Sequence, residues 1–236
     1  MTSLNGAVVL VTGANGGIGT HFVREALARG AAKVYATART PRQWDDNRIV
    51  PLTLDVTDAA SIRAALAAAQ DVTVLINNAG ASVSTPGILA HTDDEIRRNV
   101  ETNFLGPLFL ARAFAPVLSI KDNAAIIDIH SALAWWAVAG IYSATKAALW
   151  SATNSLRLEL RPAGVQVLGV HVGYVDTPMA AQATDPKVDP ADLVASVFDA
   201  LEAGEHEVLA DQTSVQLKAA LSAPLESVYP QLAVRT

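Results

Sequence analysis

The stretch VTGANGGIGT (residues 11–20) decides the fold, because it joins an apolar run to a helical segment through a cluster of glycines. Gly13, Gly16, Gly17 and Gly19 do not have the G-x-G-x-x-G spacing of the common dinucleotide fingerprint. At a strand-to-helix turn, glycine lets backbone amides approach a pyrophosphate, and the helix N-terminus attracts its negative charge. Two interpretations are therefore open at this point: a packing turn, or a phosphate-binding loop of a different design.

The rest of the chain alternates short apolar runs with amphipathic segments. The pattern predicts strands at 7–12, 33–38, 49–54, 72–77, 124–130, 165–170 and 206–210, and helices at 19–30, 58–70, 93–119, 141–161 and 190–203. Near-continuous apolar strands between helices indicate a parallel sheet that is covered on both faces. We predict one doubly wound, Rossmann-like α/β domain over residues 1–236, with ligands outside the carboxyl ends of the strands.

Composition narrows the classes of function. The chain of 236 residues is 51% hydrophobic and 17% charged, which supplies a large core, and it has no cysteine for disulfides or thiolate sites. Its net charge is −6 and its basic residues are scattered, so no nucleic-acid partner is expected. The longest uncharged stretch, 129–145, is short for a membrane span, and the start MTSLNGAVVL has no basic region typical of a signal peptide. We expect a soluble, cytoplasmic protein with no membrane partner.

Further motifs follow the glycine loop in a fixed order. They are NNAG (77–80), NVETNFLG (99–106), IHSALAW (129–135), YSATK (142–146) and HVGYVDT (171–177). Together with the T-G-x-x-x-G-x-G spacing of Gly13, Gly17 and Gly19, this set resembles the short-chain dehydrogenase/reductase family from residue 12 to residue 177. The resemblance favours the cofactor-loop interpretation and implies chemistry at a C=O or CH–OH group.

The resemblance implies four catalytic residues: Asn103, Ser131, Tyr142 and Lys146. Lys146 lies four residues after Tyr142 on one helix face. Its charge and that of the oxidised nicotinamide are expected to lower the tyrosine pKa from about 10 toward working pH. Tyr142 would then act as general acid in reduction, and Ser131 would donate a hydrogen bond to the substrate oxygen. In the family, the counterpart of Asn103 distorts a helix and holds a water. Without the motifs, Asn103 could be a surface residue and Ser131 a cap at the end of a strand.

The expected cofactor is NADP(H) in preference to NAD(H). The second predicted strand ends in YATART, where Arg39 stands and no acidic residue is available for a ribose hydroxyl. An arginine there suits the 2′-phosphate of NADP, although Arg39 could also be a solvated charge. Thr37, Arg42 and Arg48 could assist, and Asp55 matches an adenine contact or caps a helix. The predicted cofactor-binding residues are Gly13, Asn15, Gly16, Gly17, Ile18, Gly19, Arg39, Asp55, Val56, Asn78, Ala79, Gly80, Tyr142, Lys146, Gly173, Val175 and Thr177.

The predicted substrate region departs from the family pattern. Ser131 and Tyr142 are closer in sequence than is usual, and Val172 replaces the customary proline before Gly173. Trp135 and Trp136 in the shortened loop either line an apolar pocket or fill space between helices. Residues 174–190 resemble a substrate lid. The predicted substrate-binding residues are Ser131, Leu133, Trp135, Trp136, Tyr174 and Met179, which favour a bulky or aromatic compound.

These patterns predict an NADPH-dependent carbonyl reductase that acts on a small-molecule ketone or aldehyde. An NAD-dependent alcohol dehydrogenase and a nicotinamide-binding sensor are the alternatives. No metal site is expected, because the histidines show no ligand spacing, and His130 and His171 are expected to be packed or hydrogen-bonded. The apolar helices at 99–119 and 141–161 match helices that pair between subunits in the family, so a homodimer or homotetramer is expected.

Overall fold

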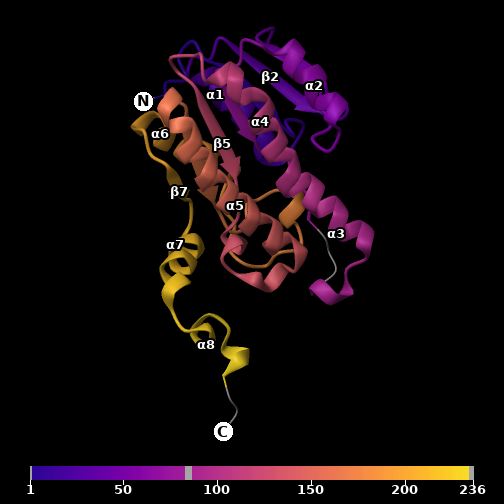
Figure 1. The fold of residues 1–236 in the computed structure, drawn as a ribbon, viewed down its shortest axis with the longest axis vertical. Helices are drawn as coiled ribbons and strands as arrows, with labels where there is room; N and C mark the ends of the chain where they lie inside the picture. Colours follow the sequence, from indigo (N-terminus) through magenta and orange to yellow (C-terminus); the bar gives the residue numbers. More distant parts are fainter. Residues whose placement is uncertain (1, 83–86, 234–236) are drawn as a thin grey trace.

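A single parallel sheet organises the structure, a computed structural model that describes residues 2–82 and 87–233 (Figure 1). Its strands are β1 (Val8–Thr12), β2 (Lys33–Ala38), β3 (Ile49–Thr53), β4 (Val74–Asn77), β5 (Ala125–Ile129), β6 (Gln166–His171) and β7 (Glu207–Leu209). They lie in the order β3-β2-β1-β4-β5-β6-β7. The order reverses between β1 and β4, which is where ligands bind in doubly wound sheets. The doubly wound α/β prediction is confirmed.

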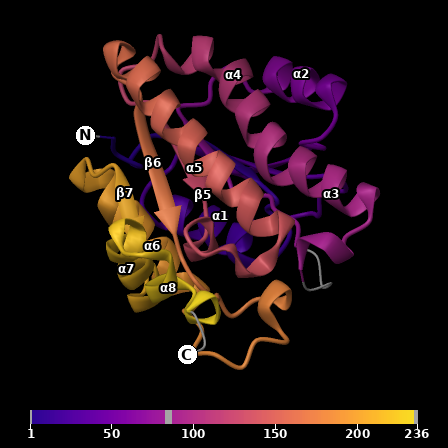
Figure 2. The same ribbon diagram turned by 60° about the horizontal axis from the view of Figure 1, so that its bottom comes forward.

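Helices cover both faces of the sheet, as Figure 2 shows. α1 (Gly17–Ala28) and α6 (Pro190–Ala203) pack on one face, and α2 (Ala59–Ala68), α4 (Gly106–Leu118) and α5 (Ile141–Leu160) pack on the other. Successive side chains of a strand point to opposite faces. Val9 and Val11 of β1 accordingly join the core beneath α1 and α6, whereas Leu10 joins the second core.

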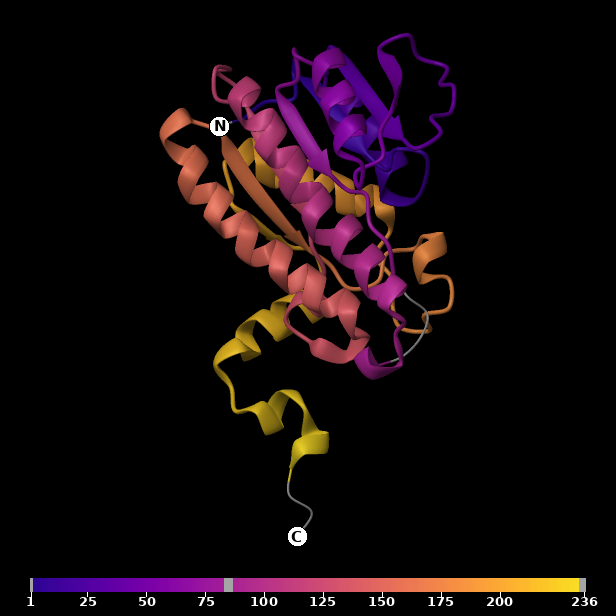
Figure 3. The same ribbon diagram turned by 45° about the vertical axis from the view of Figure 1, so that its right-hand side comes forward.

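Two regions differ from the sequence prediction. The helix predicted at 93–119 is α3 (Asp93–Val100), a π-helical turn η2 (Glu101–Leu105) and α4. After β7, the chain forms α7 (Gln212–Ala219) and α8 (Leu225–Val228), which the sequence analysis did not predict and which extend away from the sheet (Figure 3). Short 3-10 turns are η1 (Ile88–Ala90), η3 (Ala132–Ala134), η4 (Ala137–Ala139), η5 (Arg161–Ala163), η6 (Pro178–Ala180), η7 (Ala220–Ser222) and η8 (Pro230–Leu232).

Pro51 lies in β3, at the edge of the sheet, where a missing backbone N–H removes no interior ladder bond. Among the helices of residues 2–82 and 87–233, none has the length and apolar character that a bilayer crossing requires.

Candidate active site

The glycine loop between β1 and α1 forms an open cradle of backbone. Gly13 and Gly17 have φ angles of 67° and 51°, in the left-handed region that favours glycine. A Cβ atom at Gly19 would lie 2.3 Å from the Gly13 carbonyl oxygen and 2.8 Å from Asn78 Nδ2. Gly16 caps α1 without a side-chain hydrogen bond, and the first turn has no acidic residue. The first amides of α1 are thus available to an anion, and the residues present fit a pyrophosphate group.

Thr12 ties the glycine loop to the loop after β4. Its hydroxyl oxygen accepts hydrogen bonds from the backbone amides of Asn78 and Ala79, both at 2.9 Å. Asn78 Nδ2 in turn donates to the Thr12 carbonyl at 2.8 Å. Thr12 is the threonine that opens the T-G-x-x-x-G-x-G spacing, but it was not among the predicted site residues. NNAG thus holds the carboxyl ends of two adjacent strands together.

The loop after β6 closes the other side of this region. Thr177 Cγ2 lies 3.5 Å from the position of a Cβ atom at Gly17, so this loop lies beside the glycine loop. The amide of Gly173 donates to the carboxylate of Asp211, which also caps α7 by accepting from Ser214 N at 2.7 Å. Asp211 was not predicted as a site residue, because α7 was not predicted. Val172, in place of the customary proline, is buried, and its carbonyl accepts from Ala132 N at 2.9 Å.

Arg39 directly follows β2, and its side chain is accessible to a ligand. It is exposed, and its charge helps to hold the pKa of Asp55 below the usual value, after the hydrogen bonds from Thr57. Arg42 stacks on Trp44 at 3.9 Å, and Arg48 forms an ion pair with Asp46 at 2.7 Å. Both are therefore engaged elsewhere, in contrast to Arg39.

Other predicted cofactor residues lie in the surrounding loops and in the first turn of α1. Asp55 does not cap a helix, because Asp58 caps α2 by accepting from Ala60 N at 2.8 Å. Asn15 Nδ2 donates to the Thr40 carbonyl at 2.7 Å. Ile18 packs against the core, and Val56 is buried beside Gly106. Gly80 lies beside Asn103 and Lys146, and Val175 forms a bridge with Val188.

Asn103 is fully buried in the π-helical turn η2. Its Oδ1 accepts from Ala81 N at 2.8 Å, and its Nδ2 donates to the Ala81 carbonyl at 2.8 Å and to Asn99 Oδ1 at 3.1 Å. A single π turn widens a helix and is frequent at functional sites. The helix distortion that the resemblance implied is present, and the surface interpretation of Asn103 is wrong.

Ser131, Tyr142 and Lys146 come together beyond the carboxyl end of β5. The Ser131 hydroxyl lies within hydrogen-bonding reach of the Tyr142 hydroxyl, which lowers the tyrosine pKa, but burial has the larger effect and raises it above its usual value. Lys146 Nζ donates to the Ile129 carbonyl at 2.7 Å and lies 5.8 Å from the centre of the Tyr142 ring. Burial lowers the Lys146 pKa to about 8, against the opposing charge of Asp128.

Burial sets the pKa of Tyr142 in the protein without a cofactor. It raises this pKa and keeps the phenol protonated, whereas the lowering expected from the sequence depends on Lys146 together with an oxidised nicotinamide. Ser131 caps the turn that follows β5 and also lies beside Tyr142. Its oxygen caps η3 by accepting from Leu133 N at 3.1 Å, and its hydroxyl also faces Tyr142.

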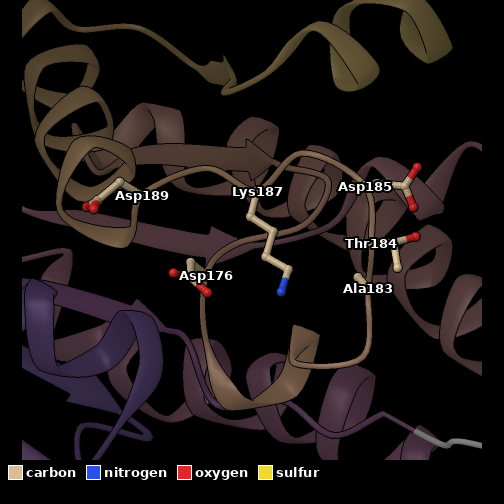
Figure 4. Close-up of a pocket in the computed structure, with 6 residues that line it drawn as sticks. All are labelled: Asp176, Ala183, Thr184, Asp185, Lys187 and Asp189. Carbon is tan, nitrogen blue, oxygen red and sulfur yellow. The ribbon is translucent and has the colours of Figure 1, made fainter.

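The predicted substrate residues do not form one surface. Trp135 is buried and stacks on His171 with ring centres 3.8 Å apart, so its packing role is the one that the structure shows. Trp136, Tyr174 and Met179 are exposed, and Leu133 is half-buried. In the predicted lid segment, a polar cavity of about 520 Å³ is lined by Asp176, Ala183, Thr184, Asp185, Lys187 and Asp189 (Figure 4). Tyr174 and Met179 do not line this cavity.

Two buried histidines, His130 and His171, are engaged with each other. His130 Nδ1 lies 3.1 Å from His171 Nε2. Across residues 2–82 and 87–233, no group of three or more potential metal ligands occurs.

Comparisons with known proteins identify the family. The family profile described as short chain dehydrogenase matches residues 7–187. A short-chain dehydrogenase of Penicillium crustosum is 39% identical over 183 residues, which are 72% of this chain and 66% of that protein, so the chain spans just under two thirds of its length. The NADPH-dependent 1-acyldihydroxyacetone phosphate reductase of Schizosaccharomyces pombe is 31% identical over 96% of this chain and 78% of that protein. The crystal structure of a short chain dehydrogenase from Burkholderia cenocepacia with NADP has a TM-score of 0.91, with 35% identity over 99% of this chain and 100% of that chain. The chain belongs to the short-chain dehydrogenase/reductase family.

Proposed function

We propose that this oxidoreductase reduces a ketone or aldehyde with NADPH, and that the reaction is reversible. The observation that carries the proposal is the convergence of Ser131, Tyr142 and Lys146 outside the carboxyl end of β5. Ser131 follows that strand, whereas Tyr142 and Lys146 lie in the first turns of α5. Three side chains from two elements therefore present a proton donor, a hydrogen-bond donor and a cation to one place.

Each side chain has a distinct task in the reduction. A bound nicotinamide cofactor would supply the hydride. Tyr142, kept protonated by burial, donates its proton to the substrate oxygen, and Ser131 stabilises the negative charge that develops there. Lys146 favours the phenolate that remains after proton transfer. Asn103, in the π turn beside Gly80 and Lys146, holds the loop after β4 in place.

The glycine cradle and the loop around Gly173 would hold the cofactor, with its pyrophosphate at the N-terminus of α1. Two comparisons support NADP(H). The S. pombe relative is named an NADPH-dependent reductase, and the B. cenocepacia structure contains NADP. The exposed Arg39 suits a 2′-phosphate.

The primary test is the loss of reduced-nicotinamide absorbance with NADPH or NADH and a panel of aliphatic and aromatic ketones and aldehydes. NADPH oxidation that depends on the carbonyl compound would support the proposal. Tight NADPH binding without turnover on the whole panel would support a sensor instead, and faster turnover of alcohols with NAD would support a dehydrogenase.

The choice of cofactor is expected to depend on Arg39. Arg39→Asp removes a charge-assisted hydrogen bond to the 2′-phosphate and adds a repulsive charge, so kcat/KM for NADPH should fall by roughly 10- to 100-fold. The value for NADH should be unchanged or higher. Arg48→Ala is the matched control, because Arg48 is paired with Asp46 and should leave the NADPH/NADH ratio unchanged. Equal losses for both cofactors in Arg39→Asp would contradict the assignment.

The pH dependence of reduction is expected to report Lys146. Its pKa of about 8 means that it is a cation below pH 8 and neutral above it. Loss of the cation removes the stabilisation of the Tyr142 phenolate, so kcat/KM for reduction should decline as the pH rises through about 8. Steady-state rates between about pH 6 and pH 10 check this. In Lys146→Arg, whose guanidinium stays charged, the decline should move to higher pH; an unmoved decline would assign it to another group.

A further inference from the structure

A buried chain of polar side chains that the proposed mechanism does not use ends at the active site. It runs from Asp128 in β5 through Thr153 in α5 to His130 and His171, and none of the four is more than 2% exposed. Thr153 Oγ1 lies 2.7 Å from Asp128 Oδ2 and 2.9 Å from His130 Nε2. His130 Nδ1 lies 3.1 Å from His171 Nε2, and His171 Nδ1 lies 3.3 Å from the Ser131 carbonyl oxygen. Each contact needs one proton between its two heavy atoms.

The Ser131 carbonyl sets the direction of the chain, because a carbonyl oxygen only accepts hydrogen bonds. His171 Nδ1 must therefore carry a proton. A neutral His171 then accepts at Nε2 from His130 Nδ1–H, and a neutral His130 accepts at Nε2 from the Thr153 hydroxyl. The single hydroxyl proton of Thr153 is now used, so the short contact with Asp128 needs a proton on the carboxyl group.

An ionised Asp128 leaves one contact of this hydrogen-bonded chain without a suitable donor. The Thr153 hydroxyl would have to donate to the carboxylate, and His130 would have to donate from Nε2. Either His171 would then point a lone pair at the Ser131 carbonyl, or one of the two histidines would become a buried imidazolium, and both outcomes are unfavourable. Thr153 Oγ1 also lies 2.8 Å from the Leu149 carbonyl oxygen. A hydroxyl proton given to Leu149 still leaves Asp128 as the donor to Thr153, but it would make His130 donate from Nε2, so the order proposed for the histidines requires that the Thr153 proton is directed to His130.

We propose that Asp128 is a neutral carboxylic acid whose proton orders this chain, and that His171 at its other end is a positioning residue for Ser131. In this arrangement, the second carboxyl oxygen of Asp128 accepts from Asn77 Nδ2 at 2.8 Å, so both oxygens have a partner. His171 fixes the peptide that follows Ser131 and also stacks on Trp135, four residues along the same shortened loop.

The charges around the chain agree with this assignment. Burial raises the pKa of Asp128 against the opposing effects of its hydrogen bonds and of Lys146 and Arg157. Burial also lowers the pKa of His130 well below its usual value and that of His171 to about 3. Glu207 Oε1 lies 3.7 Å from His171 Nε2, beyond hydrogen-bond distance, and Glu207 is paired with Lys218. A neutral Asp128 does not raise the pKa of Lys146, so Lys146 loses its proton at or below a pH of about 8.

The proton arrangement can be tested without turnover. The infrared spectrum of the intact protein at neutral pH should contain the carbonyl band of a buried protonated carboxyl group, and Asp128→Asn should remove it. In ¹⁵N NMR spectra, His130 and His171 should both be neutral and protonated at Nδ1, with assignments from His130→Gln and His171→Gln. Absence of the band, or an imidazolium or Nε2-protonated ring at either histidine, would overturn the proposal. The NMR readout stands alone if Asp128→Asn does not fold.

The positioning role rests on the proposed function and needs a kinetic test. His171→Leu should lower kcat for carbonyl reduction about tenfold, because a displaced hydrogen-bond donor loses much of its effect in the transition state. In a Ser131→Ala background, the same substitution should cost little more, since a positioning residue acts through the residue that it holds. His171→Asn, which keeps a donor near the Nδ1 position, should recover part of the loss.

Val170→Ala is the control for general damage to the core. Val170 is fully buried in the same strand, and its neighbouring position points it to the opposite face. Its effect should be the same with and without Ser131. Equal losses for His171→Leu in both backgrounds would overturn the positioning role. If the unmodified protein reduced no carbonyl compound, the proposed function would fail while the spectroscopic test still decided the proton arrangement.

Discussion

Replacement of Tyr142 by phenylalanine is expected to lower kcat/KM for carbonyl reduction by about a thousandfold. The phenol lies beside the Ser131 hydroxyl, and burial keeps it protonated, so it is the proton donor that the site offers to a substrate oxygen. Phenylalanine keeps the ring and its packing but removes the proton. NADPH binding, measured by fluorescence titration, should change by less than about threefold, because the ring still fills its position.

Tyr35→Phe is the matched control for this loss. Tyr35 is buried, and its hydroxyl bonds to Asp71 Oδ1 at 2.9 Å in the region of β2 and α2, away from the candidate site. It should keep nearly full activity. Retention of more than about a tenth of the activity in Tyr142→Phe would show that another group donates the proton, since general acid catalysis contributes about 10²–10⁴-fold.

The strand and helix pattern was predictable because each element carries its own periodic signal. β1, β4, β5 and β6 are near-continuous apolar runs, with Asp128 as the charged exception inside β5, and a parallel sheet buried on both faces requires such runs. The second α-helical layer follows from the same rule. α7 gives no comparable signal, because it has one buried residue, Ser214, and no apolar stripe directed at the core. The hydrogen bond from the Gly173 amide to the Asp211 carboxylate, which α7 contributes to the site, could therefore not be predicted from the sequence.

The candidate site was predictable where a motif combines residue type with spacing, as in Tyr142 and Lys146. The environment of each side chain could not be predicted in this way. Burial outweighs the hydrogen bond with Ser131 in setting the pKa of Tyr142, and burial depends on the packing of the whole domain. Trp135 shows the same limit. Its position in the shortened loop was clear, but its stacking on His171 depends on β6, which joins it from a distant part of the chain.

The glycine loop between β1 and α1 is expected to be intolerant of one added methyl group at Gly19. Gly19→Ala would place a Cβ atom 2.3 Å from the Gly13 carbonyl oxygen and 2.9 Å from the Gly13 carbonyl carbon, both of which are backbone. Relief requires α1 to move away from β1, which should cost about 3 kcal/mol and lower Tm by roughly 6–12 °C. NADPH binding should be lost as well, because the first amides of α1 would move out of the cradle. Thermal unfolding and fluorescence titration measure the two effects.

Gly16→Ala separates this steric effect from a general preference for glycine in the loop. Gly16 has an extended backbone with φ of −163°, and a Cβ atom there would have no neighbour within 4 Å. Its Tm should therefore remain within about 2 °C of that of the unsubstituted protein, a shift that corresponds to less than 1 kcal/mol. A similar loss of Tm in both variants would show that the close approach of Gly19 to Gly13 is not what requires glycine. A stable Gly19→Ala protein that still binds NADPH would show that α1 can shift without opening the cradle.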